Sequence, residues 1–183
     1  MRYLPLRLLL PALFALLLLA PAARSQELTA YAGALLPGTV KIDEIPTLLD
    51  KSPVFGVRFD TGFAAVLRLE HTIAFSNDLL YPSVRADAGN ARGLLLNSNL
   101  LVNIPVGRIV PYATAGLGLV SQWGADNLPI GTKFAINYGG GLKLRKLAGP
   151  LGFRIDARGY TAVKVFSRAF NMFEISGGLL FSF

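Results

Sequence analysis

The sequence predicts an all-β fold: an eight-stranded antiparallel up-and-down transmembrane β-barrel preceded by a signal peptide. Three observations predict it, namely an export segment at the N-terminus, a series of alternating apolar segments, and a final strand that ends on phenylalanine. In that strand Phe173, Ile175, Leu179, Phe181 and Phe183 share one parity, and side chains of one parity line one face of a sheet. A face this apolar needs an apolar environment.

Residues 1–25 have the three parts of a secretory signal peptide. Arg2 and Arg7 precede an apolar stretch from Leu8 to Ala20, and Ala23-Arg24-Ser25 forms a cleavage site, although Ala20-Pro21-Ala22 would also serve. An uncleaved anchor helix is the alternative, but the stretch is shorter than the ~20 residues that span a bilayer, and Pro11 interrupts it. We therefore expect an exported chain with a barrel domain at 26–183.

The composition excludes several classes of protein. Removal of Arg2, Arg7 and Arg24 with the signal peptide lowers the formal charge from +7 to +4, which does not favour a nucleic-acid partner. The chain has no Cys, so no disulfide framework supports the fold in an oxidising compartment. No apolar run after residue 25 is long enough for a spanning helix, although 52% of all residues are hydrophobic.

Eight segments with alternating apolar residues follow the signal peptide, each near the ~10 residues that a tilted membrane strand needs. They are predicted at 27–36, 53–60, 63–75, 93–104, 109–120, 132–145, 151–160 and 172–183. Long connections alternate with tight turns, the first of which is Asp60-Thr61-Gly62. This alternation is typical of an up-and-down outer-membrane barrel, whose closure removes exposed sheet edges.

Charged residues on these strands share the parity opposite to the bulky apolar set. They are Arg58, Arg68, Glu70, Lys143, Arg145, Arg154, Asp156, Arg158 and Glu174. Facing hydrocarbon, such charges would cost about 2–4 kcal/mol each at mid-depth, and their mixed signs suit mutual pairing. The sequence therefore predicts a charge network in the lumen. A soluble lipocalin-like barrel, with the charges outside and a hydrophobic ligand inside, is the alternative.

Aromatic residues concentrate near the predicted strand ends, as expected of interfacial girdles. The set comprises Tyr31, Phe55, Phe75, Tyr112, Trp123, Phe134, Tyr138, Phe153, Phe181 and Phe183.

Four segments resemble the small eight-stranded outer-membrane β-barrels of the OmpA/OmpX-like family, over essentially the whole mature chain. They are residues 27–33, the Pro-Tyr and Gly-x-Gly strand at 111–118, the glycine-rich strand at 134–143 and the charged strand at 154–160. The resemblance implies that Ile175, Leu179, Phe181 and Phe183 form the recognition signal for the outer-membrane assembly machinery. We expect a monomer whose partners are outer-membrane lipid and that machinery.

The chain has a single His, so any catalytic mechanism that requires a histidine depends on His71. Some barrels of this kind modify lipid A with a His, a Ser and a carboxylate at the outer rim. His71 is predicted to face outward near the long loops, but Ile73 stands where the resemblance would require a serine, and Glu70 points to the other face. One His without Cys supplies no plausible metal site or cofactor site. We therefore predict no catalytic site.

An eight-stranded barrel leaves room only for side chains, so an open pore is not expected. The sequence thus predicts a structural or surface-interaction protein. The alternatives are a lipid A-modifying enzyme and a soluble periplasmic barrel that binds a hydrophobic ligand.

Overall fold

The computed structural model describes residues 26–38, 40–42, 45–47, 51–64, 66–77, 79, 92–124, 131–165 and 168–183. The predicted signal peptide at 1–25 lies outside these residues. Within them, no helix is long and apolar enough to cross a membrane.

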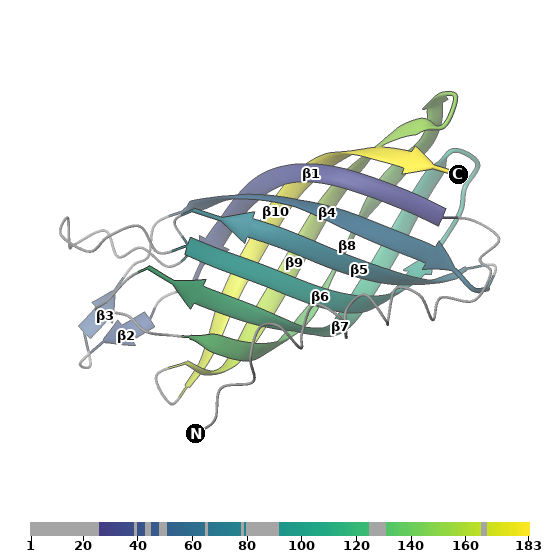
Figure 1. Ribbon diagram of the computed structural model, residues 1–183. Coiled ribbons are helices and arrows are strands. Elements are labelled where there is room, and N and C mark those ends of the chain that lie inside the picture. Colours follow the sequence, from purple (N-terminus) through teal and green to yellow (C-terminus); the bar gives the residue numbers. More distant parts are fainter. Residues whose placement is uncertain are drawn as a thin grey trace, which may run out of the picture.

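Eight strands form one closed barrel (Figure 1). They are β1 (Gln26–Pro37), β4 (Ser52–Gly62), β5 (Leu67–Ser76), β6 (Arg92–Asn103), β7 (Ile109–Trp123), β8 (Thr132–Ala148), β9 (Leu151–Val165) and β10 (Arg168–Ser182). Every neighbouring pair is antiparallel, and β1 closes the barrel by pairing with both β4 and β10. The predicted fold class is confirmed: each strand of the barrel pairs with both of its neighbours, so none of these eight strands has an open edge.

The short connections that follow β4, β6 and β8 lie with the C-terminus at one end of the barrel, and the connections that follow β1, β5, β7 and β9 lie at the other (Figure 1). Gly107 and Gly149 make two of the short turns with φ of 64° and 62°, a left-handed conformation that glycine adopts at little cost. We refer to these as the short-turn end and the loop end. Glu27 pairs with Asp60 and with Ser182 near the short-turn end, where the first and last strands meet.

Three sequence predictions about the strands were wrong in detail. Asp60, Thr61 and Gly62 do not form a turn but continue β4, and β5 begins at Leu67, where the amides of Phe63 and Ala64 reach the Leu67 carbonyl. Several strands run further toward the loop end than predicted, because paired backbone can continue beyond the apolar belt. A small hairpin, β2 (Val40–Ile42) with β3 (Ile45–Thr47), lies in the first long connection and was not predicted.

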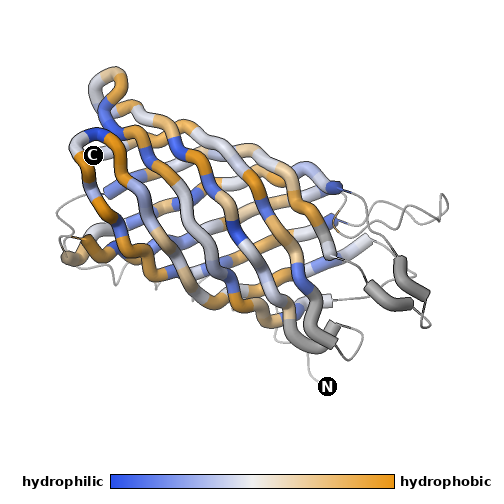
Figure 2. The backbone as a smooth tube through the Cα atoms, turned by 180° about the vertical axis from the view of Figure 1, so that it is seen from behind, coloured by the Kyte–Doolittle hydropathy of each residue, from blue (hydrophilic) through white to orange (hydrophobic). Residues whose placement is uncertain are grey.

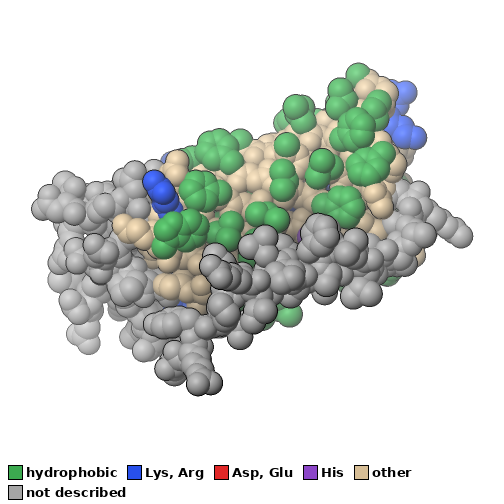
Figure 3. Space-filling view, in the orientation of Figure 1, with side chains coloured by type: hydrophobic (Ala, Val, Ile, Leu, Met, Phe, Trp, Pro, Cys, Tyr) green, Lys and Arg blue, Asp and Glu red, His purple; other side chains and the backbone are tan. Residues whose placement is uncertain are grey.

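The polarity of the wall is that of a membrane barrel, with apolar side chains outside and charges inside. Hydrophilic and hydrophobic residues alternate along the strands in Figure 2, and on the face in Figure 3 the Lys and Arg side chains lie near the two ends. On β4, Phe55 is 53% exposed and Arg58 is fully buried. The soluble alternative is wrong, because it required the charges to face water.

Two aromatic residues predicted for the girdles lie inside the barrel instead. Tyr31 and Tyr112 are each only 5% exposed and belong to the inward parity of β1 and β7. Their positions along the strand were compatible with a girdle, but their parity places them against buried charges. Trp123 and Phe134, in contrast, are exposed near the loop end, with the Trp123 ring 6.2 Å from that of Phe75.

Candidate functional site in the barrel lumen

The structure brings all the predicted lumen charges to the inner face of the barrel. Eight of the nine are buried, and the Arg145 side chain keeps 23% exposure at the short-turn end. Two carboxylates that the sequence prediction missed, Glu27 and Asp60, are buried beside them. The signal that could have found them is parity, since Thr29 and Arg58 lie two residues away on the inward face, but Asp60-Thr61-Gly62 also has the composition of a turn.

Near the short-turn end, Lys143 joins the two missed carboxylates. Its Nζ donates to Glu27 Oε2 at 2.7 Å and to Asp60 Oδ2 at 2.9 Å. Arg68 donates to Asp60 through its Nε, and Arg145 lies 2.5 Å from Glu27 Oε1. Three cations therefore hold two neighbouring carboxylates that would otherwise repel one another.

Further from the short-turn end, β9 carries a cation, a carboxylate and a second cation on successive inward positions. Arg154 and Arg158 reach Glu70 on β5 at 2.6 and 2.8 Å. Asp156 between them accepts from Arg58 at 2.8 Å and from the Tyr112 hydroxyl. Each buried charge thus has an oppositely charged partner, which is the condition for burying it at tolerable cost.

The charges of the network that lie nearest the loop end connect β4 to β10. Arg58 donates to Glu174, which also accepts from Tyr160 at 2.7 Å and from Ser176 at 2.6 Å. The guanidinium of Arg58 lies 3.6 Å from the ring centroid of Tyr31, a cation–π arrangement. The two inward tyrosines are therefore part of the network, since Tyr31 covers Arg58 and Tyr112 bonds Asp156.

Most of these ion pairs cross the lumen between strands that are not neighbours in the sheet. In the barrel order, β4 lies opposite β8 and β5 lies opposite β9, so Lys143–Asp60 and Arg154–Glu70 tie opposite walls together. Six cations and five carboxylates take part, which leaves the interior close to neutral. We call this set the ionic layer; its members are Glu27, Arg58, Asp60, Arg68, Glu70, Lys143, Arg145, Arg154, Asp156, Arg158 and Glu174.

Toward the loop end the same inward parity carries mainly apolar side chains, with the buried polar residues Ser52, Ser76 and Gln122 beside them. Buried apolar side chains there come from all eight strands of the barrel: Leu35, Val54, Ala74, Leu95, Val120, Ala135, Ala162 and Met172. Leu79, which follows β5, adds a side chain that is 1% exposed, and its carbonyl accepts from Gln122 Nε2 at 3.3 Å. We call this set, with Leu79, the apolar layer. It covers the ionic layer on the side of the loops.

The residues predicted as the assembly signal lie on the outer face of β10. Ile175 is 51% exposed, Leu179 67%, Phe181 41% and Phe183 61%. The backbone of Phe183 makes two 3.0 Å hydrogen bonds with Gln26 at the seam between the first and last strands. These residues are accessible from the apolar surroundings, and their recognition by assembly machinery stays a prediction.

His71 faces outward as predicted, but it does not lie near the loop end. It is the fifth residue of the ten-residue strand β5 and pairs with Phe59 and Ser98. Its Nδ1 lies 2.9 Å from Ser98 Oγ on the neighbouring strand, a contact that the sequence did not reveal. The structure thus supplies the serine that the sequence lacked at position 73.

A Ser–His pair needs a third group to orient the histidine in a hydrolase of the usual kind. Every Asp and Glu for which the structure describes a side chain belongs to the ionic layer inside the barrel. The same part of the chain contains no group of three or more His, Cys, Asp or Glu that could hold a metal ion. On the outer face of the wall, the described contact of the pair is the single hydrogen bond between His71 Nδ1 and Ser98 Oγ.

No family model and no curated protein matches the chain. Solved structures do match. Neisserial surface protein A (NspA) has a TM-score of 0.65 at 13% identity, with 87% of this chain and 97% of that chain covered. The N-terminal β-barrel domain of Pseudomonas aeruginosa OprF has a TM-score of 0.55 at 15% identity, covering 87% and 98%. The outer membrane enzyme PagL has a TM-score of 0.51 at 14% identity, covering 85% and 97%.

At these identities the likeness concerns the fold and leaves the activity open, since one neighbour is an enzyme and a shared fold does not imply a shared function. The resemblance predicted from the sequence is confirmed at that level. With its closed antiparallel wall, its apolar exterior and its paired interior charges, the chain folds as a small eight-stranded outer-membrane β-barrel.

Proposed function

We propose that the protein is an integral outer-membrane barrel with a structural or surface-interaction role, without an open pore and without a catalytic site. The observation that carries this proposal is the filled interior. Arg58, Glu70, Lys143, Arg154 and Arg158 are each fully buried in the lumen, and all have charged partners. A barrel of eight strands has little room beyond such side chains.

Two layers in series oppose the passage of solutes. In the ionic layer, the cross-lumen pairs Lys143–Asp60 and Arg154–Glu70 occupy the width of the barrel. In the apolar layer, Leu79 and Leu95 are buried and present no group that would solvate an ion. A permeating ion would need both layers to rearrange, which supports a sealed barrel.

The surface-interaction part of the proposal rests on the connections at the loop end. Three long connections leave the rigid wall there, between β1 and β4, between β5 and β6, and between β7 and β8, whereas the short-turn end offers only tight turns. Binding residues often lie on loops held by a rigid scaffold. The outward residues Ile175, Leu179, Phe181 and Phe183 support the further proposal that assembly machinery recognises β10 during insertion.

Fractionation of the expressed protein tests this proposal first. We expect the protein in outer membranes and a shift in electrophoretic mobility on boiling, because a closed barrel resists detergent until it is heated. Reconstituted in a planar bilayer, it should carry no steady current. A soluble periplasmic protein without the mobility shift would contradict the membrane role, and a stable conductance would contradict the sealed lumen.

A lipid A-modifying enzyme is the second candidate, and the His71–Ser98 contact is the observation in its favour. The position of the pair halfway along β5, and the burial of the nearby Glu70 in the lumen, oppose it. We expect lipid A from cells that express the protein to keep its mass, with Ser98→Ala giving the same spectrum. Loss of an acyl chain that depends on Ser98 would make this candidate the correct one.

A further inference from the structure

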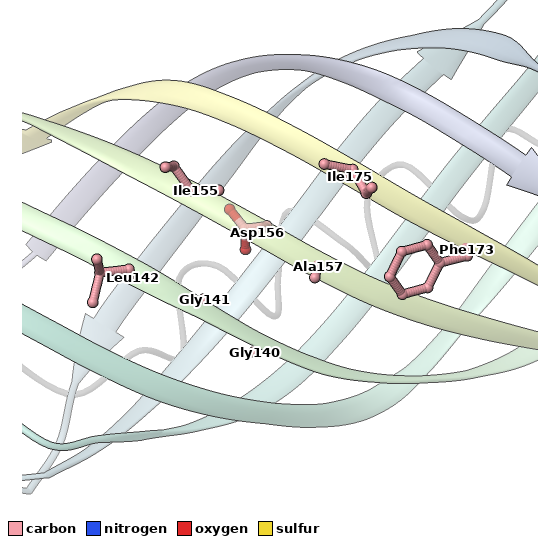
Figure 4. A pocket seen from close by; sticks show the side chains of 8 residues that line it. All are labelled: Gly140, Gly141, Leu142, Ile155, Asp156, Ala157, Phe173 and Ile175. Carbon is pink, nitrogen blue, oxygen red and sulfur yellow. The ribbon is translucent and has the colours of Figure 1, made fainter.

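An elongated depression on the outer wall crosses β8, β9 and β10 and reaches Leu36 of β1. The part nearer the short-turn end is a hollow of about 470 Å³. Gly140 and Ala157 lie at its floor, and the side chains around it are Leu142, Ile155, Phe173 and Ile175 (Figure 4). Gly140 pairs with Ala113 and with Ala157, so small residues of three neighbouring strands meet in one row. The wall is therefore thin here, between large apolar side chains.

A second hollow of about 350 Å³ continues the depression toward the loop end. It shares Ala157 and Phe173 with the first hollow and adds Tyr138, Gly159 and Asn171. Tyr138 is 54% exposed, and Asn171 accepts a hydrogen bond from Thr161 at 2.8 Å. We call the two hollows together the wall groove. Its lining is apolar toward the short-turn end and includes hydroxyl and amide groups toward the loop end.

We propose that the wall groove holds one acyl chain of a membrane lipid whose polar head lies at the loop end. The proposal rests on the proposed function, since it requires the outer wall to face lipid. The groove is continuous with the apolar belt, where Ile155, Ile175 and Leu179 are 47–67% exposed. Its volume is within the range of about 300–1,000 Å³ typical of small-molecule sites, and its order of polarity is that of a lipid in the leaflet on the loop side.

A second copy of the chain fits this surface less well. A two-fold interface brings the same patch of both subunits together, and two hollows that face each other enclose unfilled space, which forfeits packing contacts. A flexible chain can instead lie along the floor at Gly140 and Ala157 and contact Phe173 and Leu142 on the two sides. Shape therefore favours a lipid chain over self-association.

A quenching experiment tests the groove directly. Both test variants are made in the Trp123→Phe background, so that each protein has one tryptophan. Phe173→Trp places this tryptophan at the groove. Leu117→Trp is the control: on β7 it lies about as far from the loop end as residue 173 does on β10, and it lines none of the three described hollows. A phospholipid brominated on its acyl chain is titrated into each protein in detergent. We expect saturable quenching near equimolar lipid for Phe173→Trp, and only gradual quenching for Leu117→Trp.

Ala157→Phe supplies the blocking variant, because its ring would fill the floor of the groove. Ala32→Phe is the matched control, since Ala32 is also an exposed outward alanine but lines none of the three hollows. The saturable phase should disappear with Ala157→Phe and persist with Ala32→Phe. In native mass spectrometry of the otherwise unaltered chain, Ala157→Phe should likewise retain one lipid fewer.

Equal quenching at the two tryptophans, or no effect of Ala157→Phe, would overturn the proposal while leaving the membrane barrel intact. Self-association of the unaltered protein that Ala157→Phe abolishes would also overturn it, by making the groove an interface between copies. If the protein neither sediments with outer membranes nor shifts on boiling, the proposed function fails as well. The mobility shift, measured for every variant, separates these outcomes.

Discussion

The two ends of the lumen solve the same packing problem with different chemistry. Both consist of inward side chains of one barrel wall. The ionic layer consists of charged partners such as Lys143 and Asp60, whereas the apolar layer consists of buried hydrophobic residues such as Leu35, Val54 and Leu95. Ion pairs have direction and require a particular partner, while apolar burial depends mainly on area and fit. The ionic layer therefore helps to specify which strands lie opposite each other, and the apolar layer fills and closes the lumen.

The difference also predicts how each layer responds to change. A buried ion pair adds little net stability relative to a well-packed apolar pair, but removal of one partner leaves an uncompensated charge. An apolar residue that is shortened leaves a cavity and no charge. Damage to the ionic layer should thus depend on which partner remains, and damage to the apolar layer should depend on the volume removed.

The largest effect should come from Arg58→Met. It leaves Asp156 and Glu174 without the guanidinium that joins them and should lower the free energy of unfolding by about 3–5 kcal/mol. Urea unfolding in detergent, followed by Trp123 fluorescence, measures the loss. Arg108→Met, at an exposed turn position, is the control and should change stability by less than about 0.5 kcal/mol. An equally small loss for Arg58→Met would show that the ionic layer tolerates broken pairs.

A smaller effect is expected from Leu95→Ala in the apolar layer. Leu95 is fully buried beside Val120, and the cavity should lower the free energy of unfolding by about 2–3 kcal/mol, in the lower part of the range for buried leucines. Leu95→Met, which nearly conserves volume, should cost less than about 1.5 kcal/mol. The same urea titration measures both variants. If Leu95→Met were as damaging as Leu95→Ala, the layer would demand a specific shape as strictly as the ion pairs demand a partner.

The smallest quantity is the coupling between substitutions, which tests whether the layers are independent. Lys143→Met and Glu27→Gln share a 2.7 Å hydrogen bond, so together they should cost about 1–3 kcal/mol less than the sum of their separate effects. Lys143→Met combined with Leu95→Ala, which joins opposite ends of the lumen, should be additive within about 0.5 kcal/mol. Double-mutant cycles provide both values. Strong coupling between the two ends would mean that the lumen is one cooperative core.

Much of the fold was predictable because a strand has only two faces. Once Arg154, Asp156 and Arg158 share a parity, Phe153 and Ile155 must share the other, and the cost of charge in hydrocarbon decides which parity faces inward. Asn97 and Asn99 on β6 follow the same rule, since they share one parity and are both buried in the lumen. Parity and polarity together therefore indicated the closed barrel and most of its interior.

The errors occurred where local pattern and strand length conflict. Asp60-Thr61-Gly62 has turn composition, but Asp60 pairs with Glu27 and Glu70 within the sheet, and its side chain accepts from Lys143, which is 83 residues away in sequence. Tyr31 and Tyr112 are aromatic residues near strand ends, as in a girdle. They face inward instead, against charges from other strands, including Arg58 and Asp156. Similarly, the serine that contacts His71 is 27 residues away and adjoins it only across the sheet. Each feature depends on register between strands, which no local pattern contains.

The strand period, the antiparallel meander and the inward parity of the charges follow from the amino-acid sequence alone, because they depend on spacing along the chain and on transfer of charge from water. The pairing of particular charges, the division of the lumen into an ionic and an apolar layer, and the meeting of Gly140 and Ala157 in a groove on the outer wall became visible only in the folded barrel. Those features arise when the barrel closes, since closure sets the register and brings opposite strands within reach of a side chain.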